Sequence, residues 1–300
     1  MSNRKYKWLA PPLPNKDKIG RWLLTRLAAI LLLFSVILLG GGTLFKDRLI
    51  FHPVRESRLT PENYSMNYKE RWLKTAAGDS VLAWRLERRP NSENTQTILF
   101  FQGNSGNMSI MLAHLATFQG LGFECFSVDY PGYGRSPGSP SEKAVYESAE
   151  ALRQWTEELG IQAENTIIYG FSLGGGVASY LAAQKKPGAL VLDSTFTRLR
   201  DVPAHDLPFL SPYLYLILGD AFDTKGRLLT DISCPLLVLH SRADDVVPYD
   251  LGQENFRIYR HKKEMVSGQG NHMSFLMNQK AYSEKLKELS DYLAEQGGQP

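Results

Sequence analysis

Short runs of apolar residues recur through the middle of the chain, separated by segments long enough to hold helices. The runs are QTILFF, ECFSVDY, NTIIYGF, ALVLDS and PLLVLHS, all between residues 96 and 241. Continuous apolar runs of this length are typical of strands buried on both faces of a parallel sheet. Before them, alternating segments that start at Asn67 and Ser80 flank a turn at Gly78 and predict an antiparallel hairpin. The pattern therefore predicts an α/β fold with a mostly parallel central sheet and helices on both faces.

Two amphipathic segments predict helices that cover this sheet. Residues 141–160 begin with a capping signal at Ser141 and end at a glycine, and residues 281–296 carry apolar side chains at helical spacing. The connection at residues 196–233 is unusual, because it combines three prolines with the apolar stretch PYLYLILGDAF. It is either a small cap on the domain or a crossover helix on the sheet, and the pattern leaves both open.

The most apolar part of the chain is residues 27–45, which carry no charge. As a helix this segment would be about 28 Å long, close to the thickness of the hydrocarbon core of a bilayer. It is apolar on every face, which argues against a core helix, and no A-x-A-like site follows it, which argues against a cleaved signal peptide. We therefore expect one N-terminal transmembrane helix. The expected organisation is a basic tail at 1–26, the anchor at 27–45, a linker at 46–65 and a folded domain at 66–300.

Lysine and arginine are concentrated before residue 27, where Asp17 is the only acid. Because basic residues favour the cytoplasmic side, this bias predicts a cytoplasmic N-terminus and a folded domain in a periplasm, a lumen or the cell exterior. The net charge of the whole chain is only +3, and the remainder of the sequence shows no basic face. Nucleic acid is therefore not expected as a partner.

The two cysteines do not indicate a metal or redox site. Cys125 and Cys234 lie far apart in the sequence and lack C-x-x-C or Cys/His spacing. Each flanks an apolar run, so both are expected to be buried in the core.

Two stretches match the G-x-S-x-G pattern of a hydrolase nucleophile, at 170–174 and 134–138. A nucleophilic serine needs an exposed hydroxyl, and a sharp turn from a strand into a helix supplies one. Ser172 follows the apolar run NTIIYGF and precedes the small-residue segment LGGGVASYLAA, so it fits this turn. Ser136 lies among prolines that prevent a helix from starting there. We predict Ser172 as the nucleophile and place Ser136 in a loop.

In such a turn arrangement the chain order is serine, then an acid, then a histidine. His272 lies in the glycine-rich segment SGQGNHMSF, after an expected last strand KEMVSG and before the C-terminal helix, and is the best base. The acid must come from a loop after a strand, within reach of that histidine. LHSRADDVVP offers Asp244 and Asp245, and spacing alone does not separate these neighbours. The other downstream histidines fit the order or the setting less well: His205, His240 and His261. His240 directly precedes the acid loop, so it is expected to pack or to hydrogen-bond beneath that turn.

An oxyanion that develops on the substrate needs two backbone donors. We expect one from the amide of Leu173, directly after Ser172, and the other from the loop after the first parallel strand, FFQGNSGN, where Asn104 is the candidate. Each such donor can contribute roughly 2.7–4 kcal/mol of transition-state stabilisation, so this loop matters nearly as much as the triad.

Together these motifs resemble the α/β-hydrolase superfamily, and most closely its branch with a single membrane anchor, which includes protein depalmitoylases and lysophospholipid lipases. The resemblance extends from about Leu49 to the C-terminus. It rests on motifs in the family's order: LIFHP, FQGNSGN, VDYPGYGRSPGSPSE, YGFSLGGGVA, LVLDSTFT, LHSRADDVVP and GNHMSF. It implies Asp244 as the triad acid, and hydrolysis of acyl esters or thioesters through an acyl-enzyme without a metal or organic cofactor. The chain departs from the family at Gln102, where histidine is usual, and at Ser241, where glycine is usual.

The sequence thus predicts a membrane-anchored serine hydrolase with Ser172, His272 and Asp244 as its triad. A lipid or lipidated substrate is favoured, because the anchor confines the site near a bilayer. A peptidase or a small-ester hydrolase of the same fold is the alternative within this class. A non-catalytic membrane scaffold with a hydrolase fold is the alternative from another class, and Gln102 is the feature that points to it.

Overall fold

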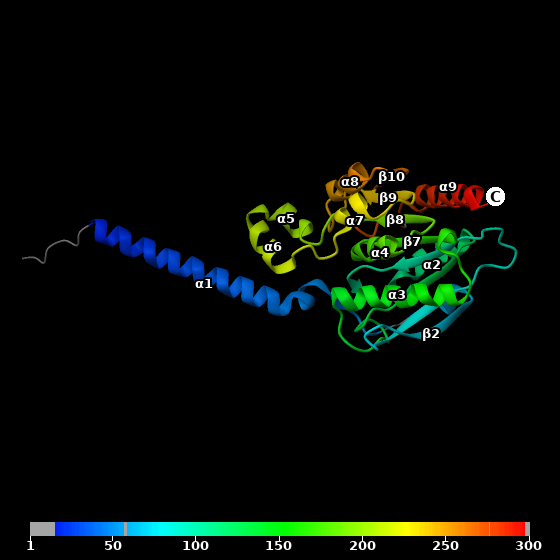
Figure 1. Cartoon of the computed structure of the whole chain (residues 1–300), viewed down its shortest axis with the longest axis horizontal. Helices are drawn as coiled ribbons and strands as arrows, with labels where there is room; N and C mark the ends of the chain where they lie inside the picture. Colours follow the sequence, from blue (N-terminus) through cyan, green and yellow to red (C-terminus); the bar gives the residue numbers. More distant parts are fainter. Residues whose placement is uncertain (1–15, 57–58, 276, 298–300) are drawn as a thin grey trace, which may run out of the picture. The chain divides into compact units, whose positions relative to one another are not determined.

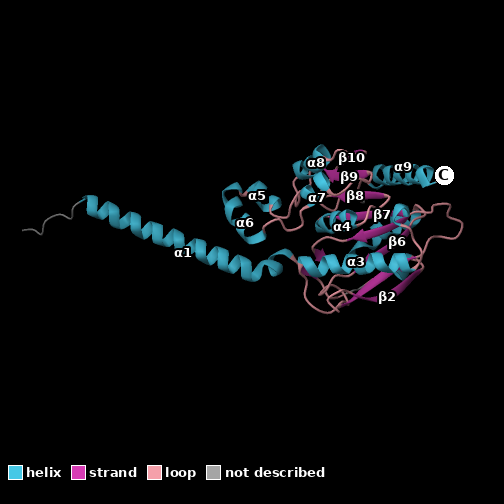
Figure 2. Ribbon diagram, in the orientation of Figure 1, coloured by secondary structure: helices cyan, strands magenta, loops and turns pink. Residues whose placement is uncertain are grey.

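The computed structural model describes residues 16–56, 59–275 and 277–297. The chain divides into two compact units, Met1–Phe45 and Lys46–Pro300. The second unit contains an 8-stranded sheet with the order β10-β9-β8-β7-β4-β6-β3-β2, drawn in magenta in Figure 2. A separate pair joins β1 to β5. The strands are β1 (His52–Pro53), β2 (Tyr68–Lys74), β3 (Ser80–Leu86), β4 (Thr97–Phe101), β5 (Ser105–Gly106), β6 (Glu124–Val128), β7 (Thr166–Phe171), β8 (Ala189–Asp193), β9 (Leu236–Ser241) and β10 (Lys263–Gly268).

The sheet is parallel except at one edge, as predicted. β4 pairs in parallel with β6 and β7, and β7 through β10 continue in parallel on the far side. β2 and β3 form the predicted hairpin, and β3 joins the sheet antiparallel to β6. Side chains of β4 alternate between two cores, with Leu99 on one face and Ile98 and Phe100 on the other. Burial on both faces explains why the central strands read as continuous apolar runs.

Helices cover both faces of the sheet, as Figure 1 shows, and this confirms the predicted α/β class. α3, α4 and α7 contribute buried side chains to one core, among them Leu152 and Val177. α2 and α9 contribute to the other core, with Leu115 and Leu286. The helices are α1 (Lys16–Ile50), α2 (Leu112–Gly120), α3 (Glu142–Glu158), α4 (Leu173–Gln184), α5 (Asp201–Asp206), α6 (Ser211–Leu218), α7 (Thr224–Thr230), α8 (Tyr249–Ile258) and α9 (Gln279–Gly297). Single 3-10 turns are η1 (Pro61–Tyr64), η2 (Met108–Met111), η3 (Ala163–Asn165) and η4 (Pro208–Leu210).

The apolar N-terminal segment is helical. The run predicted at 27–45 lies within α1, whose stretch Leu24–Ile50 of 27 residues is long and apolar enough to cross a membrane. Of the basic tail expected at 1–26, residues 1–15 lie outside the described part of the chain.

The segment expected as a linker, residues 46–65, does not extend as a free spacer. It contains the end of α1, β1 and η1, and Ile50 and Phe51 are buried in the core of the second unit. β1 pairs with β5 in parallel. The segment is therefore part of the folded unit, because its apolar and backbone groups find partners there.

For the connection at 196–233 the sequence leaves two alternatives open, a crossover helix on the sheet and a small separate cap, and the structure contains an element of each kind. α7 packs on the sheet side, where Leu228 is buried in the core beneath it. α5, η4 and α6 form a separate small segment, and no residue of these three elements is fully buried. We call residues 201–218 the α5–α6 segment.

His114 on α2 is buried in an aromatic cluster, with ring centroids 4.4 Å from Phe275 and 6.0 Å from Phe171. Neither ring nitrogen has a hydrogen-bond partner among the described residues. Burial lowers the pKa of His114 to about 4, whereas an unperturbed histidine has a pKa of about 6.5. Between these values only the unfolded chain binds the proton. The stability contributed by neutral His114 is therefore complete above about pH 6.5 and is lost as the pH falls towards 4.

We expect His114→Phe to remove this acid sensitivity, because phenylalanine suits the same cluster and cannot be protonated. As the pH falls from about 7 to about 4, the free energy of unfolding of the variant should rise by about 3 kcal/mol relative to the wild type. Denaturant unfolding curves of both proteins at several pH values measure this difference. A difference that stays constant with pH would show that His114 does not titrate in this way.

Candidate active site

Ser172 lies at the turn between β7 and α4, at the carboxyl edge of the sheet. Its backbone has φ 54° and ψ −121°, a positive-φ conformation that is uncommon outside glycine. The turn is tight, because a Cβ at Gly170 would overlap the carbonyl of Gly174, and a Cβ at Gly174 would overlap the carbonyl of Phe101. The chain is thus strained at the serine and has no room for side chains beside it, which is the geometry of a nucleophile elbow.

Ser136, in the second G-x-S-x-G match, is in a different setting. It lies in a loop and is fully buried. Its hydroxyl donates to the carbonyl of Asp129 at 2.7 Å and accepts from the amide of Leu82 at 2.9 Å. With both roles of the hydroxyl taken by backbone groups, Ser136 ties the loop to β3 and is not available to a substrate.

His272 and Asp244 lie together at the same sheet edge as Ser172. His272 follows β10 and Asp244 follows β9, and these strands are parallel neighbours. Nδ1 of His272 lies 2.9 Å from Oδ2 and 3.0 Å from Oδ1 of Asp244. Burial acts to raise the pKa of Asp244, but hydrogen bonds from His240 and His272 and the charge of His272 outweigh it and hold this pKa well below its usual range. Asp244 is therefore a carboxylate that can orient the imidazole of His272.

The imidazole of His272 lies beside the elbow. Its ring centroid is 5.0 Å from that of Phe171, the residue before Ser172. In the described part of the chain the Ser172 hydroxyl makes no hydrogen bond, and the residue is 7% exposed. Such bonds are often long without substrate and tighten when it binds. The structure thus brings the three predicted residues to one place, without a direct bond between Ser172 and His272.

Two neighbours contact the His272–Asp244 pair. Oδ1 of Asp245 accepts from the backbone amide of His272 at 2.9 Å and so holds its loop rather than its ring. His240 is fully buried, with Nε2 3.3 Å from Oδ2 of Asp244 and 3.0 Å from the carbonyl of Val247. The sequence excludes His240 as the base because it precedes the acid, and predicts that it packs or hydrogen-bonds beneath the turn. Its place at the end of a buried strand, four residues before Asp244, is the signal that could have identified it as a support for that acid.

Asp193 is a second buried acid that sequence reasoning did not select. It ends β8, beside the strand that carries Ser172. Its carbonyl accepts from the amide of Ser172 at 2.9 Å, and its Oδ2 accepts from the Tyr169 hydroxyl at 2.6 Å. Burial raises the pKa of Asp193 to about 6. An acid at the end of a buried strand next to the elbow strand is the pattern that marks it in the sequence.

Of the two predicted oxyanion donors, Leu173 directly follows Ser172, and Asn104 lies in the loop after β4. Leu173 is the first residue of α4, where amides have no partner within the helix. The loop after β4 passes close to the elbow, since a Cβ at Gly103 would lie 3.3 Å from Cβ of Ser172. The side-chain amide of Asn104 is taken, because it donates to the carbonyl of Ile50 at 2.9 Å. The backbone amides of Asn104 and Leu173 have no acceptor among the described residues. Both are therefore available to an oxyanion.

Gln102, where the family usually has histidine, is buried beneath this loop. Its Nε2 lies 3.4 Å from Oδ1 of Asp129, and its Oε1 has no partner in the described ranges. Burial raises the pKa of Asp129 to about 6, and Oδ1 of Asp129 accepts from the amide of Met108 at 2.7 Å. Gln102 thus contacts the acid that holds the start of η2, directly after the oxyanion loop.

Both cysteines are residues of the hydrophobic cores. Cys125 and Cys234 are buried, as predicted, and burial raises the pKa of the Cys234 thiol to about 12. Within residues 16–56, 59–275 and 277–297, no group of at least three His, Cys, Asp or Glu side chains is placed to hold a metal ion.

The fold agrees with comparisons to known proteins. A protein family described as alpha/beta hydrolase fold matches residues 96–224, which include β4, the elbow and β8. The chain has the α/β-hydrolase fold. An esterase of Pyrococcus furiosus, 18% identical, aligns with 82% of this α/β hydrolase and 98% of its own chain at a TM-score of 0.68, which shows that the two share the fold.

Relatives of this α/β hydrolase include a lysophospholipid lipase, as its motifs predicted. It is 29% identical over 249 residues to the alpha/beta hydrolase domain-containing protein WAV2 of Arabidopsis thaliana, a match that covers 75% of this chain and 80% of that protein. It is 33% identical over 186 residues to the lysophosphatidylserine lipase ABHD12 of Danio rerio, with 56% of this chain and 48% of the lipase covered. The chain thus matches about half the length of that lipase. The chain thus combines an α/β-hydrolase fold with one N-terminal helix that is long and apolar enough to cross a membrane.

Proposed function

We propose that this α/β hydrolase cleaves acyl esters or thioesters through an acyl-enzyme on Ser172. The observation that carries the proposal is the pairing of Nδ1 of His272 with the Asp244 carboxylate at 2.9 Å, beside a strained elbow that presents Ser172. This set combines a nucleophile, a base and an acid that orients the base. The esterase and lipase names of similar proteins agree with it.

In the proposed mechanism, Asp244 holds the Nδ1 proton of His272, which leaves Nε2 free to accept the proton of the Ser172 hydroxyl. The serine oxygen then attacks the acyl carbonyl, and the amides of Asn104 and Leu173 bind the oxyanion. His272 returns the proton to the alcohol or thiol as that group leaves. Water next attacks the acyl-enzyme, again through His272, and releases the acid. Every proton in this cycle passes through His272, so neither a metal nor an organic cofactor is required.

The favoured substrate is a lipid or a lipidated molecule. The similar lysophosphatidylserine lipase supports this class, and the apolar stretch Leu24–Ile50 would hold the enzyme at a membrane. We further propose, from the charge bias of the N-terminal tail, that the hydrolase domain lies in a periplasm, a lumen or the cell exterior.

A fluorophosphonate probe tests this proposal, because it reacts with activated serine nucleophiles. We expect the full-length protein to be labelled once, with the modified peptide containing Ser172. Heat-unfolded protein is the matched control and should not react. A folded protein that neither reacts with the probe nor hydrolyses short p-nitrophenyl esters would contradict the proposal and favour the scaffold alternative.

A further inference from the structure

The apolar helix ends directly at the oxyanion loop. Ile50, the last residue of the apolar stretch, accepts at its carbonyl from the side-chain amide of Asn104 at 2.9 Å. The next residues continue the contact, because the amide of His52 donates to the carbonyl of Asn104 at 2.9 Å and that of Val54 to the carbonyl of Gly106 at 2.9 Å. All of these residues belong to the unit that carries the candidate active site. The chain therefore leaves the apolar stretch at the edge of the sheet where Ser172 lies.

This contact limits how far the site can be from a membrane. The helix rises by about 8 Å from Phe45, the end of the uncharged run, to Ile50. Asn104 is one hydrogen bond away from Ile50. If the apolar stretch crosses a bilayer, the short link from Phe45 to Ile50 keeps the oxyanion loop close to the headgroup layer, which is roughly 5–8 Å thick on each side of the hydrocarbon core.

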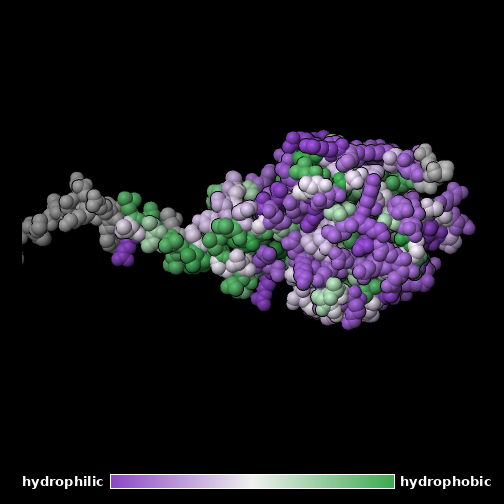
Figure 3. Space-filling view, viewed as in Figure 1, coloured by the Kyte–Doolittle hydropathy of each residue, from purple (hydrophilic) through white to green (hydrophobic). Residues whose placement is uncertain are grey.

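The α5–α6 segment adds an exposed apolar surface. Phe209 is 71% exposed, Leu216 61% and Tyr215 56%. The stretch Pro208–Leu218 carries no charge and is too short to cross a bilayer, which takes about 20 residues of helix. In Figure 3 the surface over the sheet is mostly hydrophilic, whereas hydrophobic residues gather over α6. Exposed apolar surface of this kind is typical of a membrane or protein contact.

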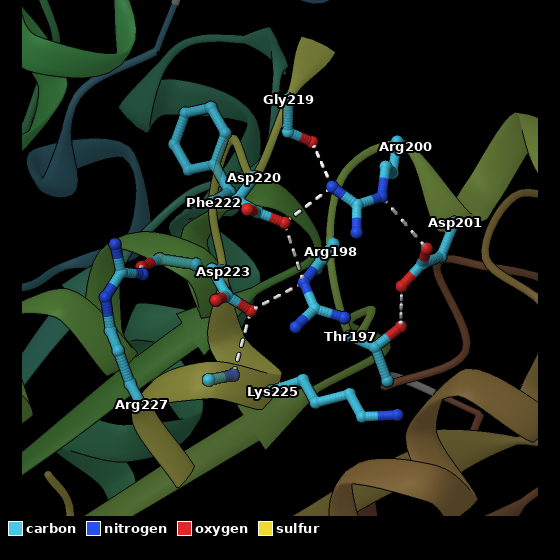
Figure 4. A network of polar contacts seen from close by, with 12 residues as sticks. Thr197, Arg198, Arg200, Asp201, Gly219, Asp220, Phe222, Asp223, Lys225 and Arg227 are labelled. Carbon is cyan, nitrogen blue, oxygen red and sulfur yellow. Dashed lines mark hydrogen bonds and ion pairs between the residues drawn. The ribbon is translucent and has the colours of Figure 1, made fainter. Parts of the chain in front are cut away.

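The charges at the base of this segment are paired with one another, as Figure 4 shows. Arg198 forms ion pairs with Asp220 at 3.2 Å and with Asp223 at 3.0 Å. Arg200 pairs with Asp220 at 2.5 Å and lies over the ring of Tyr215 at 4.9 Å. These contacts join the chain entering the segment to the chain leaving it. Because the arginines are engaged there, contact with a membrane would depend on apolar side chains rather than on attraction to anionic lipids.

The rim of the candidate site carries apolar side chains as well. Ile110, after the oxyanion loop, is 50% exposed, and Met273, directly after His272, is 42% exposed. The base of the α5–α6 segment is near the chain that leaves α1, since the rings of Phe51 and Phe222 lie 6.2 Å apart. His205 and Asp206 of α5 line one pocket together with Asp244 and Asp245. The end of the apolar stretch, the candidate site and the α5–α6 segment therefore lie on one side of the hydrolase domain.

We propose that this side lies against the bilayer that holds the chain's own apolar helix, with the α5–α6 segment inserted into the headgroup layer. The partner is the lipid surface itself, and the substrate enters the site laterally from it. The lateral entry rests on the proposed function, whereas the docking does not. Insertion driven by apolar side chains should occur on zwitterionic lipid and should not weaken when salt is raised.

Fluorescence quenching of the full-length protein in phosphatidylcholine vesicles tests the docking. Leu216→Cys and Leu159→Cys are each labelled with an environment-sensitive maleimide. The native cysteines are buried and do not compete. Leu159 is a matched control, because it is a 42% exposed leucine at the amino edge of the sheet, opposite the site. We expect spin-labelled lipid to quench the label at Leu216, and aqueous iodide to quench the label at Leu159, at both low and high salt. Equal iodide quenching at the two positions would overturn the docking.

A second measurement tests lateral entry. The double variant Phe209→Ser and Leu216→Ser should hydrolyse a long-chain ester embedded in vesicles about tenfold more slowly or worse, because it loses two apolar contacts with lipid. Its kcat/KM for soluble p-nitrophenyl acetate should match the wild type. Equal loss on both substrates would overturn lateral entry, and so would no loss on either. If the wild type itself hydrolyses neither ester, the proposed function fails while the quenching experiment still decides the docking.

Discussion

Replacing Ser172 by alanine is expected to lower kcat for a short p-nitrophenyl ester by a factor on the order of 10⁶, the size of effect known for loss of a serine nucleophile. The reason is chemical, because without the hydroxyl no acyl-enzyme forms. Only binding and the oxyanion donors remain to assist direct attack by water. KM should change little, since the side chain removed is small. Steady-state kinetics of the purified variant, with its folding checked by thermal unfolding, measure this.

Ser136→Ala is the matched control, since it removes a hydroxyl from the second G-x-S-x-G match. Its kcat should stay close to that of the wild type. Its free energy of unfolding should fall by about 1–3 kcal/mol, because the buried amide of Leu82 and the carbonyl of Asp129 lose their partner. If Ser172→Ala kept full activity while Ser136→Ala lost it, the assignment of the nucleophile would be wrong.

The parts of the fold that are coded locally could be predicted from the sequence. A strand that is buried on both faces has a continuous apolar sequence, so each parallel strand could be identified from its own residues. The turn at Ser172 could be predicted as well. A strained elbow with close backbone contacts requires glycine at 170 and 174, and both glycines are present in the sequence. Residues of the candidate site follow β4, β7, β9 and β10, and the carboxyl ends of parallel strands share one edge. Their convergence therefore follows from the predicted sheet.

Contacts between distant segments could not be predicted in this way. Nothing in the sequence around residues 46–65 shows that Ile50 and His52 bond to Asn104, because the partners are more than 50 residues apart. The exposure of the α5–α6 segment could not be predicted either, because an apolar sequence does not show whether its side chains cover a core or remain exposed.

Spacing alone does not show which of the neighbours Asp244 and Asp245 is the triad acid. Replacing each of them separately by asparagine is expected to have very different effects on activity. In Asp244→Asn the carboxylate that faces Nδ1 of His272 is replaced by an amide, which can donate to Nδ1 and favour the wrong tautomer of the ring. The imidazolium formed during attack also loses its counter-charge. We expect kcat to fall about 10⁴-fold, with little change in KM, because the loss acts on the transition state.

Asp245→Asn keeps an oxygen that can still accept from the backbone amide of His272, where Asp245 makes its 2.9 Å contact. The ring and its partner are untouched, so kcat should fall less than about tenfold. Parallel pH–rate profiles of the two variants measure the contrast, and labelling by the fluorophosphonate probe should be lost in Asp244→Asn alone. The reverse order of effects would make Asp245 the acid. It would require the loop at His272 to turn its ring away from the partner that it has in the structure.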